Sequence, residues 1–130
     1  MKVDKIIALI KERVGSNYEL PGWKSHRKMS VIPINSITEK AFIPPKDAKQ
    51  ASVSIILFEE NNQLFFLLTK RTDNVEHHKG QVSLPGGAID KNETAQNASL
   101  RETKEEIGID SSTLKSLGQL SSLYTPVSYF

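Results

Sequence analysis

The stretch of sequence that decides the fold runs from Gly87 to Ile109 and reads GAIDKNETAQNASLRETKEEIGI. Its second half predicts a charged helix over Ala95–Ile107, with Thr94 or Asn92 as the residue that caps its start. Gly108 follows the last helical position, where a glycine commonly ends a helix. The segment is therefore expected to form a glycine turn, a short loop and a helix with defined ends.

Three glutamates of this helix are expected on one face. At about 100° per residue, the side chains of Glu102, Glu105 and Glu106 fall within an arc of about 100°. Like charges at i,i+4, as at Glu102 and Glu106, destabilise a helix unless solvent or a counter-ion offsets them. Carboxylate oxygens suit Mg²⁺ or Mn²⁺, so a divalent cation is a suitable counter-ion. Taken alone, however, these residues favour a solvated face with an Arg101–Glu105 ion pair.

The other positions of the helix divide between packing and open space. Leu100, Thr103 and Ile107 gather in a separate strip, which predicts the side that packs on a sheet. Ala95 and Ala98 fall in the same sector as the glutamates, one or two turns earlier. Their small side chains predict room for a ligand beside the carboxylates.

The residues around the helix favour chemistry over a solvated face. Their spacing resembles the Nudix box, G-x5-E-x7-R-E-U-x-E-E-x-G-U, in which U is a bulky aliphatic residue. The matching positions are Gly87, Glu93, Arg101, Glu102, Glu105, Glu106, Gly108 and Ile109. Thr103 departs from the pattern at an aliphatic position, and as a β-branched residue it is expected to affect packing more than chemistry.

The resemblance implies a fold of the α/β class, an α/β/α sandwich with a mixed sheet. It also implies Mg²⁺ or Mn²⁺ as cofactor, with Glu102 and Glu106 as principal ligands and Glu105 as a third ligand or as the base. Arg101 would hold a glutamate of the box in place, and Glu93 would organise the loop or bind the metal through water. The box positions with a structural role would be Gly87, Glu93 and Gly108.

A second motif precedes the box and suggests a substrate. Leu67–Arg71, Gly80 and Leu84–Gly87 are similar to the motif L-L-T-x-R-(S/A)-x3-R-x3-G-x3-F-P-G-G of the coenzyme A diphosphatase branch of the superfamily. The positions that differ are Thr72, Glu76 and Leu84, of which Glu76 removes a cation near the anionic ligand. The resemblance implies cleavage of coenzyme A or an acyl-CoA to 4′-phosphopantetheine and adenosine 3′,5′-bisphosphate.

The residues expected to bind this substrate are Arg71, Gly86, Gly87 and Lys79. Pro85-Gly86-Gly87 is expected to form a sharp turn that brings backbone close to the ligand. Three alternatives stay open: hydrolysis of another nucleoside diphosphate derivative such as ADP-ribose, a non-catalytic module that senses nucleotides, and an inactive fragment.

The rest of the chain suggests an amino-terminal arm and one domain. Residues 1–50 are expected to form a helix over 3–14 and an extended arm over 17–49, and residues 51–130 to form the Nudix domain. The apolar runs Ala51–Phe58 and Leu64–Leu68 predict a β-hairpin, because the paired asparagines between them tolerate a tight turn.

The carboxyl end predicts an exposed edge. A last strand is expected over Leu117–Tyr124, whereas the family continues past the position of Phe130 with further strands and a closing helix. The fold would then be incomplete. Either a homodimer formed through the open edge or the amino-terminal arm, or a truncated form with impaired stability and turnover, is expected.

Composition limits the other function classes. A chain of 130 residues suits one domain, and the absence of cysteine excludes disulfides and thiolate sites, which fits a cytoplasmic protein. Residues 1–50 carry ten Lys and Arg against five Asp and Glu, whereas residues 51–130 carry seven against ten. A basic arm of this kind favours a small polyanionic nucleotide as ligand, with a solvated lysine-bearing surface as the alternative. No membrane partner is expected because the longest apolar run, Ile55–Phe58, is too short to span one. No nucleic acid partner is expected because the basic residues lack interleaved aromatic residues.

Overall fold

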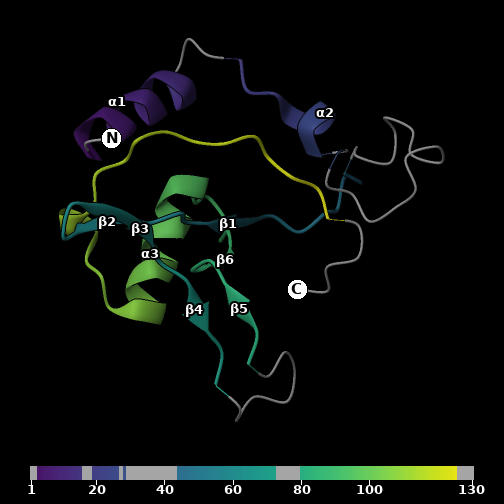
Figure 1. Ribbon diagram of the computed structural model, residues 1–130. Coiled ribbons are helices and arrows are strands. Elements are labelled where there is room, and N and C mark those ends of the chain that lie inside the picture. The colour runs from purple at the N-terminus through teal and green to yellow at the C-terminus, as the bar shows by residue number, and fades with distance from the viewer. Residues whose placement is uncertain (1–2, 16–18, 27, 29–43, 73–79, 126–130) are drawn as a thin grey trace. The chain divides into compact units, whose positions relative to one another are not determined.

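The computed structural model describes residues 3–15, 19–26, 28, 44–72 and 80–125 of the chain. These residues form helices and short strands (Figure 1), which confirms the expected α/β class. They divide into two compact units, one comprising Gln50–Lys115 with the first three residues, the other Asp4–Lys49 with Ser116–Phe130. The division into an arm at 1–50 and a domain at 51–130 stays a prediction.

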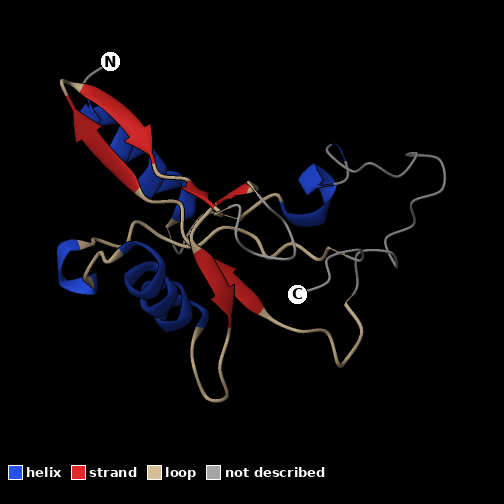
Figure 2. Ribbon diagram, turned by 90° about the horizontal axis from the view of Figure 1, so that it is seen from below, coloured by secondary structure: helices blue, strands red, loops and turns tan. Residues whose placement is uncertain are grey.

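The strands of the first unit pair as three two-stranded antiparallel sheets, β1 with β6, β2 with β3, and β4 with β5 (Figure 2). Their bounds are Ala51–Val53 for β1, Leu57–Glu60 for β2, Gln63–Phe66 for β3, Thr69–Lys70 for β4, Val82–Ser83 for β5 and Gly86–Ala88 for β6. In the part of the chain that the structure describes, every strand pair is antiparallel, so the expected mixed sheet is represented by antiparallel pairs alone.

The hairpin of β2 and β3 is confirmed, with its turn where the asparagines predicted it. Asn61 and Asn62 have φ angles of 50° and 64°, the left-handed conformation that a two-residue hairpin turn requires. Glu60 then pairs with Gln63, and the rings of Phe58 and Phe65 stack across the strands at 5.6 Å between centroids.

The predicted run Ala51–Phe58 is two strands rather than one. Ser54 N–H still donates to the carbonyl of Pro85 at 2.8 Å, on the β6 side. The carbonyl of Ile56 instead accepts from Leu67 N–H at 3.0 Å, on the β3 side. The strand breaks because the chain changes its hydrogen-bonding partner between these two residues.

The expected turn at Pro85-Gly86-Gly87 is also corrected, because Gly86 and Gly87 form most of strand β6. Val53 pairs with Gly86 and Ser52 with Gly87. A side chain on Gly86 would collide with the backbone of β1, so glycine is needed there for the two strands to approach this closely.

Helix α3 spans Ala95–Ile107, as the sequence predicted. Thr94 is the cap, since its hydroxyl accepts from Asn97 N–H at 3.2 Å. Gly108 ends the helix in the left-handed conformation at φ 73°, and its N–H donates to the carbonyl of Lys104. A short 3-10 helix, η4, follows at Ser111–Thr113.

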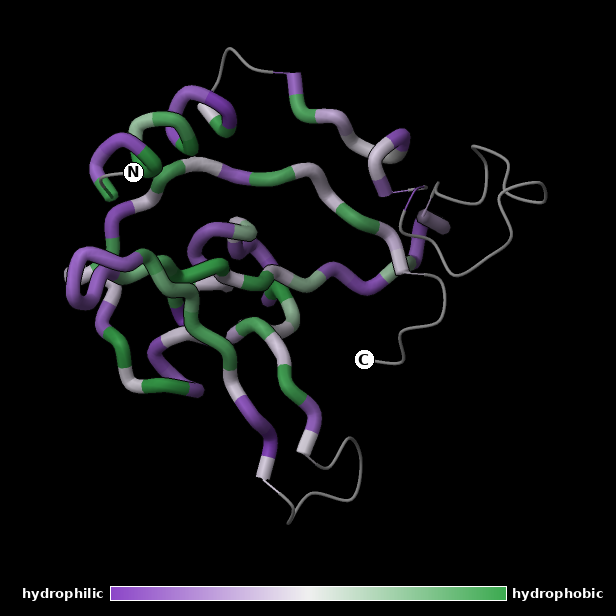
Figure 3. The backbone as a smooth tube through the Cα atoms, in the orientation of Figure 1, coloured by the Kyte–Doolittle hydropathy of each residue, from purple (hydrophilic) through white to green (hydrophobic). Residues whose placement is uncertain are grey.

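Helix α1 spans Val3–Val14, belongs to the second unit from Asp4 onward, and confirms the expected amphipathic helix. Figure 3 shows hydrophobic and hydrophilic residues alternating around its turns. The half-buried residues are Ile6, Ile7, Ile10 and Val14, whereas Lys11, Glu12 and Arg13 are exposed. The arm was expected to be extended throughout, but it contains a second helix, α2, at Gly22–His26. Pro21 stands just before α2, at a position compatible with a helix start.

The expected strand at Leu117–Tyr124 is not formed, and this described segment is irregular. It instead contacts the two helices of its own unit (Figure 1). Gly118 lies against the carboxyl end of α1, where an added Cβ would be 2.6 Å from the carbonyl oxygen of Val14. The hydroxyl of Ser121 accepts from Gly22 N–H at 3.2 Å. The segment therefore contacts α1 by close packing and α2 by a hydrogen bond, and it forms no strand ladder within the described residues.

Candidate active site

Helix α3 packs on β1 and β6 through small residues. Ala98 and Thr103 are 0% exposed, and β6 has glycine at two of its three positions. Ala98 was expected to leave room for a ligand, and this prediction was wrong. The short side chains on both elements bring helix and strand together, so the packed face extends into the sector of the glutamates.

The threonine that departs from the family pattern lies within this packed face. Thr103 Oγ1 donates to the carbonyl of Ser99 at 2.7 Å and contacts Ser54 Oγ at 3.4 Å. The hydroxyl is thus satisfied although the side chain is fully buried, which removes the cost of burying a polar group. Thr103 contributes to packing rather than to the row of carboxylates.

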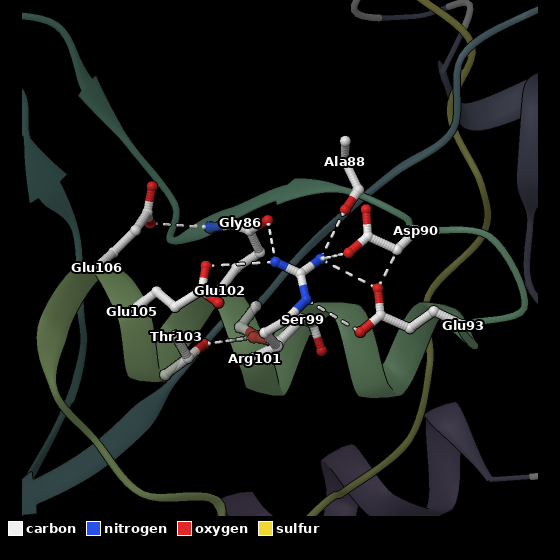
Figure 4. Close-up of polar contacts among 11 residues, drawn as sticks. Gly86, Ala88, Asp90, Glu93, Ser99, Arg101, Glu102, Thr103, Glu105 and Glu106 are labelled. Carbon is white, nitrogen blue, oxygen red and sulfur yellow. Dashed lines mark hydrogen bonds and ion pairs between the residues drawn. The ribbon is translucent and has the colours of Figure 1, made fainter.

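Arg101, in the middle of α3, is the centre of a polar network that reaches the loop before the helix (Figure 4). Its Nε and Nη2 donate to the two carboxylate oxygens of Glu93, at 3.1 and 3.0 Å. Nη2 also donates to the carbonyl of Ala88 at 3.0 Å and lies 3.7 Å from Asp90 Oδ2. The guanidinium therefore ties the helix to the end of β6 and to the loop between them.

The remaining nitrogen of Arg101 faces the carboxylates of its own helix. Nη1 donates to Glu102 Oε1 at 2.7 Å and to Glu105 Oε2 at 3.3 Å. The Glu102 side chain is 17% exposed and that of Glu105 is 60% exposed. The i,i+4 ion pair that the sequence suggested is therefore present, as one contact among several.

These contacts shift the pKa values of the pair. Hydrogen bonds from Arg101, and then the Asp90 N–H, hold the pKa of Glu93 below its ordinary value. The pKa of Arg101 is raised, mainly by Glu93 and then by Glu102. Both shifts favour the charged forms, so the pair is ionised at neutral pH.

Glu93 also closes the loop that leads into the helix. Its Oε2 accepts from Asp90 N–H at 3.1 Å, and its own N–H donates to the carbonyl of Asp90 at 3.0 Å. Asn92 between them has a φ of 68°, which an asparagine tolerates in a tight turn. Glu93 thus links the loop to Arg101, and its suggested roles, organising the loop or binding the metal through water, stay predictions.

Strand β6 contacts the carboxylates of Glu102 and Glu106. Gly86 N–H donates to Glu106 Oε2 at 3.1 Å. A Cβ added to Gly87 would lie 2.5 Å from Cδ and Oε1 of Glu102. Glu102 and Glu106 are therefore held side by side along the same strand.

The donor set suits a hard divalent cation, because Glu102, Glu105 and Glu106 offer only carboxylate oxygens. Across residues 3–15, 19–26, 28, 44–72 and 80–125, however, no three His, Cys, Asp or Glu side chains converge closely enough to hold an ion as they stand. Arg101 binds two of the carboxylates and Gly86 the third. Binding a cation would require side-chain rotation, and the three glutamates as metal ligands stay a proposal.

The residues expected to bind substrate are only partly described. Gly86 and Gly87 lie directly beside the glutamates. Arg71 follows β4 and is exposed, and its N–H donates to the carbonyl of Gln81 at 3.0 Å. Lys79 and Glu76 lie outside the residues that the structure describes.

The far end of α3 has a second ion pair. Lys104 Nζ donates to Asp110 Oδ2 at 2.9 Å, and Asp110 Oδ1 caps η4 by accepting from Ser112 N–H at 3.0 Å. The hydrogen bond from Ser112, followed by that from Lys104, lowers the pKa of Asp110 to about 2. This pair fixes the chain where it leaves the helix.

Sequence reasoning missed the contacts made by backbone and small residues. The carbonyl of Ala88, the N–H of Gly86 and the hydroxyl of Ser54 all bind residues of α3. No side-chain pattern marks such groups, because every residue carries the same backbone atoms. The contacts of Asp90 with Arg101 and Glu93 were also missed. In the sequence, only its position shortly after the two glycines points to Asp90.

Comparison with known proteins identifies the region that holds this site. The sequence model described as the NUDIX domain matches residues 48–130. Nudix hydrolase 3 of Caenorhabditis elegans is 36% identical over 98 residues, which cover 75% of this chain and 40% of that protein. Nudix hydrolase 22, chloroplastic, of Arabidopsis thaliana is 35% identical over 99 residues, covering 72% of this chain and 32% of that protein.

A bacterial relative extends the comparison. The uncharacterized Nudix hydrolase NudL of Klebsiella aerogenes is 37% identical over 78 residues, covering 59% of this chain and 64% of that protein. The chain therefore spans between about a third and two thirds of the length of these relatives. No solved structure matches the chain. None of its described helices is long and apolar enough to cross a membrane.

Proposed function

The chain belongs to the Nudix family, and on this premise we propose that it hydrolyses a diphosphate bond in a nucleotide derivative with the aid of a divalent cation. The observation that carries the proposal is the row of carboxylates on α3, which lies against β6 and around Arg101. A row of like charges on a short helix is unfavourable without a cation, and one guanidinium offsets only part of it.

The chain's own residues divide the chemistry among them. A bound Mg²⁺ or Mn²⁺ would supply positive charge for the diphosphate and lower the pKa of a water molecule. Glu102 and Glu106 would hold the cation, and Arg101 would keep the carboxylates oriented. Hydrolysis breaks one P–O bond of the diphosphate and forms another to the water oxygen, whose proton passes to Glu105. Glu105 suits that role because its side chain is 60% exposed.

Coenzyme A or an acyl-CoA is the substrate that we propose, because Leu67–Arg71 and Leu84–Gly87 are similar to the motif of that branch. The names of the relatives say only that they are Nudix hydrolases, so the substrate rests on this motif. Arg71, Lys79 and the backbone of Gly86 and Gly87 would contact its phosphates. A cytoplasmic location and a homodimer stay predictions.

The test is a substrate panel with coenzyme A, acetyl-CoA and ADP-ribose, each with Mg²⁺, with Mn²⁺ and with chelator. Phosphorus NMR identifies the products, and water labelled with ¹⁸O shows which phosphorus is attacked. The expected result is metal-dependent release of 4′-phosphopantetheine and adenosine 3′,5′-bisphosphate. Faster cleavage of ADP-ribose would reassign the substrate and leave the reaction class standing.

A control variant on α3 outside the row of carboxylates separates loss of chemistry from loss of helix stability. Lys104→Gln changes an exposed residue of α3 whose side chain pairs with Asp110 and not with the carboxylates of the proposed site, so it should leave turnover unchanged. A chain that binds coenzyme A in calorimetry with Mg²⁺ but yields no product would be a nucleotide-sensing module. The proposed activity would be refuted by a folded chain that neither binds coenzyme A nor hydrolyses any substrate of the panel.

A further inference from the structure

Gly87 is a glycine whose backbone does not require glycine. The described glycines with positive φ are Gly22, Gly80, Gly86, Gly108 and Gly118. Gly87 is not among them, so an alanine has no conformational penalty at this position. A side chain at position 87 is excluded by lack of space.

The obstacle is the carboxylate of Glu102. An added Cβ on Gly87 would be 2.5 Å from Cδ, 2.5 Å from Oε1 and 2.7 Å from Oε2 of that side chain. These nearly equal distances mean that the carboxylate lies flat over the Gly87 Cα. Its Oε1 is held from the other side by Arg101 Nη1 at 2.7 Å. The carboxylate is therefore clamped between the guanidinium and a strand position without a side chain.

The neighbouring glycine has a different role. A Cβ on Gly86 would meet two backbone atoms of β1, the carbonyl oxygen of Ser52 and, at 2.6 Å, Val53 Cα, with Val53 Cγ1 next at 2.9 Å. Gly86 is thus required by the pairing of β1 with β6. Its N–H, in addition, binds Glu106. The roles of Gly86 and Gly87 can therefore be distinguished by experiment.

We propose that Gly87 is a positioning residue, whose missing side chain forms the slot that keeps the Glu102 carboxylate on β6, on the strand that also binds Glu106, where the two glutamates would bind a cation. The proposal rests on the proposed function, because it assigns Glu102 to the cation. With a methyl group in the slot, the carboxylate must rotate away while the strand keeps its place. The loss then falls on cation binding and kcat, and the fold is retained.

A double-mutant cycle tests the slot without relying on activity. Gly87→Ala, Glu102→Ala and the double variant are compared by urea unfolding, with Gly86→Ala as the contrast. Gly87→Ala should lower the unfolding midpoint of the natural chain, because the added methyl group meets the Glu102 carboxylate. In the Glu102→Ala background the same substitution should not lower the midpoint. Gly86→Ala should lower the midpoint equally in both backgrounds, because its obstacle is backbone.

Mn²⁺ alone, titrated by electron paramagnetic resonance, reports the positioning role. Mn²⁺ affinity should fall about 10-fold to 100-fold in Gly87→Ala, the range expected when the support of a ligand is removed. Under turnover, kcat should fall with little change in KM. Unchanged Mn²⁺ affinity, or a Gly87→Ala cost that persists beside Glu102→Ala, would overturn the proposal. The natural chain could also fail to bind Mn²⁺ and to turn over substrate, while the double-mutant cycle still couples Gly87 to Glu102. That result would refute the proposed function but support the slot at Gly87.

Discussion

The guanidinium of Arg101 and the carboxylate of Glu93 face each other edge to edge, joined by hydrogen bonds of 3.1 Å from Nε and 3.0 Å from Nη2. This bidentate geometry fixes the plane of the guanidinium as well as its position. Because Nη1 projects from the same plane toward Glu102, the Glu93 contact also sets where that carboxylate is held. The loop before α3 thus controls the row of carboxylates on it.

The Glu93 contact predicts an acid-sensitive stability. The folded Glu93 has a pKa below its ordinary value of 4.5, so the unfolded chain binds the proton more readily. The contribution of Glu93 to the free energy of unfolding is therefore complete above about pH 4.5 and is lost as pH falls through the lower pKa of the folded state. In Glu93→Gln, the melting temperature should change less over that interval. Melting curves between pH 6 and pH 3 provide the measurement.

Asp110 provides an internal comparison for this prediction. Its pKa falls from 3.8 to about 2, so its contribution is lost only at lower pH, within that range. Glu93→Gln should therefore keep the stability loss that begins below pH 3.8. If the natural chain and Glu93→Gln lose stability in parallel from pH 5 downward, the Glu93 pair does not cause the acid sensitivity.

Glu106→Gln is expected to abolish turnover while the fold persists. The amide oxygen can still accept from Gly86 N–H, so the contact with β6 is retained. The charge is lost, however, and kcat should fall by at least about 100-fold, beyond the usual effect of a residue that only supports a ligand. Turnover at saturating Mg²⁺ and circular dichroism measure the two effects. Activity close to that of the natural chain would remove Glu106 from the proposed ligands.

Ala98→Leu should destabilise the chain by about 1–3 kcal/mol, the usual cost of overpacking a filled interior. Ala98 is 0% exposed where α3 meets the strands, so three added carbons must displace the helix or β6. Chemical denaturation measures the change. Gln96→Leu, at an exposed position of the same helix, should alter stability by about 0.5 kcal/mol or less. Equal effects at the two positions would mean that the helix does not pack here.

Asn62→Val should destabilise the β2–β3 hairpin by about 1–2 kcal/mol, because a side chain with a branched Cβ is strained in the left-handed conformation. Asn62 has a φ of 64° there. Asn62→Gly is the control, since glycine adopts this angle freely and should cost much less. Urea unfolding of the three chains compares them. A valine variant as stable as the glycine variant would mean that the turn has another geometry.

The sequence by itself determined the elements that depend on neighbouring residues. Helix α3 begins after Thr94 and ends at Gly108 because capping and left-handed termination are decided within one turn of the helix. The hairpin turn at Asn61 and Asn62 is local for the same reason. Family membership also follows from spacing along the chain, and the match over residues 48–130 agrees with it.

Only the tertiary structure decided which backbone lies beside the carboxylates. Gly86 and Gly87 look like a turn in sequence, yet they form a strand because Ser52 and Val53 lie within hydrogen-bonding reach. The expected strand at Leu117–Tyr124 is irregular for the converse reason, since Ser121 within it binds the N–H of Gly22, at the start of a helix. Strand pairing depends on residues far away in the chain, whereas helix ends do not, and this difference in range separates what the sequence predicted from what it missed.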